Sequence, residues 1–195
     1  MRGYYSSTMK TPTMKTKITW FDYYNATTRH EAAHAVVAAA LHIDVVSMSA
    51  IGDKRLKNAA GSCWTRDRAH FKLGEHIAVD LAGYYQEKID GNNSARDAAV
   101  GDLENVATLK RLYHEHMLCA SYATWYGSWW RFFLHWARVS KKMVRMYQDD
   151  ILRVASDLVM AEGKMGKRQC GWALADVQQI DYSEIHFERV AQEAA

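Results

Sequence analysis

The sequence predicts a mainly α-helical domain with one small β-hairpin. Three observations support this fold class. The only proline of the 195 residues is Pro12, so the rest of the chain lacks the strongest helix breaker. Apolar residues recur at helical spacing in several segments after it. Only two short runs have the β-branched and small residues that are typical of strands.

The first expected elements are an arm, a helix and a hairpin. Residues 1–18 are polar and contain the proline, so we expect a flexible N-terminal arm ahead of one domain over residues 19–195. Trp20 to His42 should be a helix that is buried on most sides, because alanine and valine make several of its faces apolar. Asp44 to Ile51 and Ala59 to Thr65 should be two strands joined by a charged loop.

Helices account for the remaining segments. Lys72 to Ile89 carries one apolar stripe, and Asp102 to about Leu118 is a further helical segment. Ser128 to Ala161 is a long helical stretch, either continuous or broken once, and the residues after Gly171 should form a short helix and a tail. Because two strands cannot organise a fold of this size, the helices must bury the core among themselves.

Composition and charge exclude several classes of protein. Lys and Arg number 25 against 22 Asp and Glu, and the resulting charge of +3 is too small for a dedicated nucleic-acid-binding protein. No stretch approaches the ~18 apolar residues that a membrane span needs. The three cysteines are isolated, which argues against a disulfide framework or a cysteine zinc site and favours the cytoplasm.

The most informative residues are His30-Glu31-Ala32-Ala33-His34, an H-E-x-x-H motif within the first expected helix. Residues four apart lie on one helical face, so both imidazoles can reach the same ion. Zinc accepts imidazole nitrogen, and catalytic zinc sites keep one position for water. Glu31 is placed to take a proton from that water. The motif therefore predicts Zn²⁺ bound by His30 and His34, with Glu31 as the catalytic base.

A structural interpretation of the same residues is the alternative. Thr28 and Glu31 have the spacing of a helix capping box, and the two histidines could be ordinary, partly buried side chains. The helical pattern begins near Trp20, however, which puts Thr28 inside the helix. Two histidines and a carboxylate would also be costly to bury on an alanine-valine helix without a purpose. We therefore favour the metal site.

The surroundings of this motif resemble the peptidase domain of FtsH-type AAA zinc metalloproteases. The sequence T-R-H-E-A-A-H-A-V-V-A from Thr28 is similar to that family's H-E-A-G-H-A-L-V-A. I-A-V-D-L-A-G-Y-Y-Q-E from Ile77 is similar to its I-x-x-x-L-G-G-R-A-A-E-E, and G-D-L-E-N-V-A-T from Gly101 to its N-D-L-x-x-A-T. The three motifs occur in the family's order and extend over about residues 20 to 118.

The resemblance implies a third zinc ligand. In the family this ligand is the aspartate of N-D-L, which corresponds to Asp102 here. From the residues alone, an aspartate that follows a glycine at a helix start is also a common N-cap. Glu87 is the rival ligand, or an acceptor that orients a ligand imidazole. Departures from the family's pattern, among them Ala33 and Tyr84, suggest altered packing around the second helix.

The same resemblance implies a zinc metalloendopeptidase that hydrolyses peptide bonds in unfolded or short polypeptides. The hairpin would hold the substrate as an added strand, through Ala50 and Ile51 or through Gly61 and Ser62, unless it is a purely structural hairpin. The chain contains no G-x-x-x-x-G-K-[ST] phosphate loop. The peptidase would therefore act without ATP or with an ATPase partner in trans, and the family's hexameric rings suggest a homo-oligomer.

Two other functions are compatible with the sequence. A non-catalytic, peptidase-like interaction module could keep zinc as a structural tie and bind protein partners. Such a site, however, has no need of Glu31. The zinc could also serve to hydrolyse a bond other than a peptide bond, since a fold does not determine a reaction.

Two further patterns lie on the long helical stretch. An aromatic stripe at helical spacing comprises Trp125, Trp129, Phe132, Phe133 and Trp136. We expect it in the core or at a subunit interface, and the alternative is a membrane-surface or substrate-binding belt. Arg138, Lys141, Lys142 and Arg145 should form an exposed helical face that is too small to support nucleic-acid binding.

Overall fold

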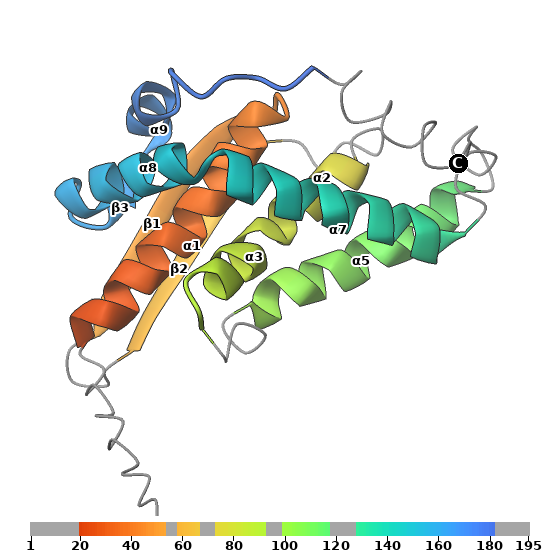
Figure 1. The fold of residues 1–195 in the computed structure, drawn as a ribbon, viewed down its shortest axis with the longest axis horizontal. Coiled ribbons are helices and arrows are strands. Elements are labelled where there is room, and N and C mark those ends of the chain that lie inside the picture. The colour runs from red at the N-terminus through yellow and green to blue at the C-terminus, as the bar shows by residue number, and fades with distance from the viewer. Residues whose placement is uncertain (1–19, 54–57, 67–72, 93–98, 118–127, 182–195) are drawn as a thin grey trace, which may run out of the picture.

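The structure is a computed structural model that describes residues 20–53, 58–66, 73–92, 99–117 and 128–181. Its described part is mainly helical with a small antiparallel sheet, which confirms the predicted fold class (Figure 1). The expected N-terminal arm lies outside the described residues. Among the helices that are described, none has the length and apolar character that crossing a membrane requires.

The helix α1, Trp20–Ala40, is the central element of the structure (Figure 1). It packs against the sheet and against helices α2, α3 and α8. Nearly every side chain from Ala32 to Leu41 is buried, as the alanine-valine pattern predicts. The hydroxyl of Thr28 donates to the carbonyl of Asn25 at 2.9 Å, one turn back within the same helix. Thr28 is therefore an interior helical residue and not the N-cap of a capping box.

The predicted hairpin consists of β1, Val45–Asp53, and β2, Asn58–Thr65, which pair antiparallel. A third strand that the sequence analysis did not predict, β3, Lys164–Met165, pairs with β1 along its other edge. The strand order is β2-β1-β3, so β1 is the middle strand. A strand of two residues carries no periodic pattern, and only its tertiary pairing identifies it.

The predicted single helix from Lys72 to Ile89 was wrong in one respect. It is divided at Leu81 into α2, Leu73–Asp80, and α3, Ala82–Ile89. The amide of Leu81 still donates to Ile77 at 3.0 Å, so the two helices form one kinked rod.

Side-chain donors explain the kink. The carbonyl of Ala78 accepts a hydrogen bond from the hydroxyl of Ser140 at 2.6 Å, and the carbonyl of Val79 accepts one from His34 at 2.6 Å. Side chains that enter the main-chain hydrogen-bond ladder are a recognised cause of helix kinks. Since both donors come from other helices, sequence periodicity along α2 and α3 could not indicate the break.

The remaining helices follow the predicted order. They are α5, Val100–Met117, then α7, Trp129–Met146, and α8, Gln148–Met160, with the single break at Tyr147. The last helix was predicted after Gly171, but α9 spans Lys167–Ala173 and contains this glycine.

A single hydrophobic cluster joins these elements. From the aromatic stripe, Phe132 and Trp136 are buried in this cluster, and Trp129 and Phe133 pack against it half-buried. These residues confirm the core interpretation for part of the stripe, whereas Trp125 lies outside the described residues.

The contact between α2 and α7 leads to a stability prediction. A Cβ added to Gly74 would lie 2.0 Å from ring atoms of the buried Trp136. We expect Gly74→Ala to lower the free energy of unfolding by about 1–3 kcal/mol through overpacking, measured by urea denaturation. Gly171→Ala is the control, because a Cβ there meets nothing within 4 Å. It should be neutral or stabilise by up to about 1 kcal/mol through helix propensity. Equal stabilisation by both substitutions would contradict the packing argument.

Candidate metal centre

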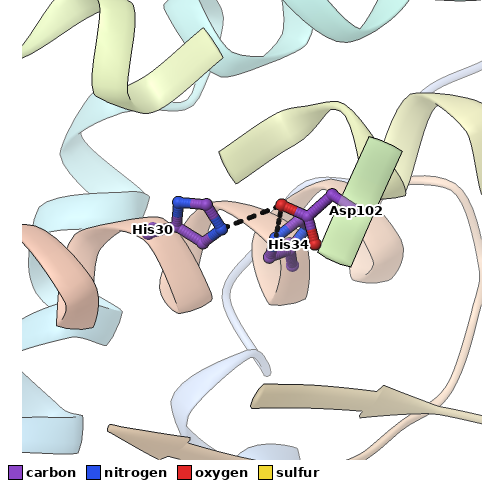
Figure 2. Close-up of side chains that lie close together, drawn as sticks. All are labelled: His30, His34 and Asp102. Carbon is purple, nitrogen blue, oxygen red and sulfur yellow. Dashed lines mark hydrogen bonds and ion pairs between the residues drawn. The ribbon is translucent and has the colours of Figure 1, made fainter. Parts of the chain in front are cut away.

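The structure brings together three side chains from two helices. His30 and His34 lie one turn apart on α1, and Asp102 lies in the first turn of α5, 72 residues after His30. Oδ2 of Asp102 is 3.0 Å from Nε2 of His30 and 3.3 Å from Nε2 of His34 (Figure 2). The three candidate ligand atoms all lie within 4.8 Å of one another.

This geometry suits a single metal ion. Ligand atoms at about 2.0–2.1 Å from a tetrahedral zinc ion lie roughly 3.3 Å from each other, close to the observed 3.0 and 3.3 Å. Two imidazole nitrogens and one carboxylate oxygen form a donor set that zinc accepts, and one that iron(II) also accepts. With three protein ligands, a tetrahedral ion keeps one position for water.

The ring of His30 is held from its other side by Glu87 on α3. Nδ1 of His30 lies 3.4 Å from Oε1 of Glu87, and the second oxygen of Glu87 accepts a hydrogen bond from the side-chain amide of Asn92. A carboxylate that accepts from Nδ1 directs Nε2 toward the ion. Glu87 therefore fits the orienting role better than that of a ligand. No sequence pattern had pointed to Asn92.

The ring of His34 is oriented by the main chain. Its Nδ1 donates to the carbonyl of Val79 at 2.6 Å, in the kink between α2 and α3, and this leaves Nε2 facing Asp102. The sequence analysis missed Val79 because its contribution is a backbone carbonyl, which is independent of the side chain. No residue pattern could have identified it.

Two glycines allow close approach to the site. A Cβ added to Gly83 on α3 would lie 2.3 Å from Nε2 of His30, and one added to Gly61 on β2 would lie 2.4 Å from Oε1 of Glu31. Both positions need glycine because a side chain would have no space there, and not because of the backbone conformation. An isolated glycine inside a helical or strand pattern is the sequence signal that could have indicated such contacts.

The charges of the site depend on one another. Burial lowers the pKa of His30, but its hydrogen bonds with Asp102 and Glu87 outweigh this effect and raise the pKa to about 10. Burial raises the pKa of Asp102. The two histidines outweigh this effect through their charges and their hydrogen bonds, and they hold the pKa of Asp102 well below its usual range. Burial raises the pKa of Glu31. An ion would have to displace the proton of His30, because only neutral imidazole coordinates metal.

The sheet restricts where a substrate strand could add. The amide of Ala50 donates to the carbonyl of Gly163 at 2.8 Å, and Ile51 follows it on the same middle strand. The prediction that Ala50 pairs with a substrate strand was therefore wrong, because Gly163, directly before β3, already accepts from its amide. Gly61 and Ser62 lie on β2, an outer strand of the described sheet, and Gly61 contacts Glu31.

No family model matches the chain, and a search of curated proteins finds no significant match. The resemblance to FtsH-type peptidases thus stays a prediction from the three sequence motifs.

Asp102 is the candidate ligand that can be tested most directly. We expect Asp102→Ala to lower the zinc content of the purified protein from about one ion per chain to well below half, because a third of the donor set is lost. Metal content is measured by mass spectrometry after dialysis. Glu104→Ala is the matched control, since Glu104 is an exposed carboxylate on the same helix. Equal zinc content in both variants would exclude Asp102 as a ligand.

The clearance at Gly83 leads to a second prediction. In Gly83→Ala the new methyl group would meet Nε2 of His30, and the ring must turn away from its position. Zinc affinity should fall by about 10–100-fold, the range found when groups around metal ligands are altered. Competition with a chelator measures this change. Gly101→Ala, where a Cβ meets nothing within 4 Å, should leave the affinity unchanged.

Proposed function

We propose that the chain is a zinc-dependent metalloendopeptidase that hydrolyses peptide bonds in unfolded or short polypeptides. One observation carries the proposal. The carboxylate of Asp102 approaches both Nε2 atoms of the H-E-x-x-H histidines, and Glu31 of the same motif is buried with only 5% of its surface exposed. Two imidazoles, a carboxylate and a neighbouring buried glutamate are the groups that metal-assisted hydrolysis requires.

The proposed chemistry divides between the ion and Glu31. When bound, zinc would supply Lewis acidity, which lowers the pKa of a water toward ~7 and polarises the peptide carbonyl. Glu31 would take a proton from the water while the water oxygen adds to the carbonyl carbon. It would then pass this proton to the amine as the carbon–nitrogen bond breaks. Burial raises the pKa of Glu31, which favours proton acceptance near neutral pH.

The other residues of the site would position these groups. Glu87 and the carbonyl of Val79 accept hydrogen bonds from the Nδ1 atoms, so that both Nε2 atoms are directed toward Asp102. Such contacts restrict the tautomer and the orientation of each ligand ring. None of these residues would contact the reacting bond.

The outer strand supports a peptide as the substrate. Gly61 of β2 lies against Glu31, so a chain added along β2 would pass the proposed base. Main-chain pairing of this kind requires an extended substrate and does not depend on its side chains. Unfolded or short polypeptides meet this requirement directly, whereas a folded substrate would need an ATPase partner in trans.

A non-catalytic interaction module with a structural zinc is the main alternative. Structural zinc sites use four protein ligands, whereas the described residues contribute a group of three. A structural site also needs no buried carboxylate beside it. Both observations favour catalysis.

The decisive variant is Glu31→Gln, which keeps the size of the side chain and removes its basicity. We expect cleavage of an unstructured polypeptide such as denatured casein to fall by about 10²–10⁴-fold, while zinc content is retained. Glu104→Gln, an exposed substitution on α5, should keep full activity. If wild type and Glu31→Gln cleave equally, or if neither cleaves with zinc bound, the interaction module becomes the better hypothesis.

A further inference from the structure

The solvent-facing side of α7 carries a stripe of positive charge. The helix contains five Lys or Arg residues and no Asp or Glu. All five are exposed, and we call them the basic face: Arg131, Arg138, Lys141, Lys142 and Arg145. At 3.6 residues per turn they fall within an arc of about 100° and extend about 21 Å along the helix axis. The opposite side of α7 packs against α2 and α3.

The charge of the basic face is local to this helix. The whole chain carries a formal charge of only +3, so the rest of the chain is slightly acidic. Arg138, Lys141, Lys142 and Arg145 line an open surface depression of about 460 Å³ together with Met146. A cluster of four to eight cations on one helix is the pattern by which proteins bind acidic lipids.

Exposed apolar side chains lie at both margins of the basic face. Trp130 precedes its first residue and is 62% exposed, and Met146 follows its last residue and is 52% exposed. On the helical projection they fall about 80° to either side of Arg138. Tryptophan is the side chain that most favours the membrane interface, because its ring is apolar and its N–H is polar.

We propose that the basic face of α7 docks the protein reversibly on an anionic membrane surface. Its cations would contact lipid phosphates, while Trp130 and Met146 would enter the headgroup region. Nucleic acid fits less well, because the apolar side chains at both margins would gain nothing against a phosphate backbone. This inference goes beyond the proposed peptidase activity and does not depend on it.

Vesicle binding by the full chain tests the proposal. The protein is sedimented with vesicles of phosphatidylcholine that contain about 30% phosphatidylglycerol, at about 0.1 M salt. Binding should be absent with pure phosphatidylcholine. Because each Lys or Arg near an anionic surface contributes roughly fivefold, the triple variant Arg138→Gln, Lys141→Gln, Arg145→Gln should lower the partition coefficient about 100-fold.

A control of equal net charge separates the basic face from charge in general. Lys110, Arg111 and Lys167 are exposed cations on α5 and α9, and replacing all three with Gln should reduce binding by less than about fivefold. Trp130→Ala should weaken binding severalfold without changing its dependence on salt. Circular dichroism and thermal unfolding verify the fold of each variant.

Three results would overturn the proposal. The first is the absence of binding to the anionic vesicles, and the second is an equal loss of binding in the two triple variants. The third is tighter binding to a duplex or single-stranded oligonucleotide than to vesicles, with an affinity that Trp130→Ala does not change. The last result would assign the basic face to nucleic acid.

Discussion

The structure depends on the approach of one carboxylate, that of Asp102, to two imidazoles on α1. Oδ2 lies within 3.3 Å of both Nε2 atoms, although the groups are distant in the sequence. His30 and His34 are almost fully buried, and charged or polar side chains at such positions are costly unless they are paired. The pairing fixes the start of α5 beside the middle of α1. The half of α1 that is almost wholly buried thus also carries His30 and His34, two of the proposed metal ligands, which gives the site a rigid support.

The surroundings of the site depart from regular geometry beside the proposed ligands and Glu31. At the kink between α2 and α3 the carbonyl of Val79 accepts a hydrogen bond from His34, and a glycine in α3 leaves space for the ring of His30. On the other side of α1, a glycine in β2 leaves space for Glu31. Local irregularities of this kind are expected where function, and not stability, determines the packing. They support the proposal that these groups form a working site.

The proposed membrane contact uses a different part of the molecule. The basic face lies on the side of α7 that is turned away from α2 and α3, and these two helices also contact α1. If α7 docks on a membrane, α2 and α3 would therefore lie between the lipid and the helix that carries the histidines. The two proposals can be tested with separate variants, since they share no residue.

Sequence patterns were sufficient to predict the fold class, most helix positions, the hairpin and the motif residues His30, Glu31 and His34. These features follow from local periodicity and from spacing within one helix, which short-range interactions control. Asp102 was predicted as a ligand only through the resemblance, because a carboxylate at the start of a helix is equally often an N-cap. Three features became visible only in the folded chain: Asp102 meets both histidines, β3 pairs with Met48 and Ser49 of β1, and Val79 orients His34. Each of these features joins segments that are remote in the chain, and a local pattern does not encode such contacts.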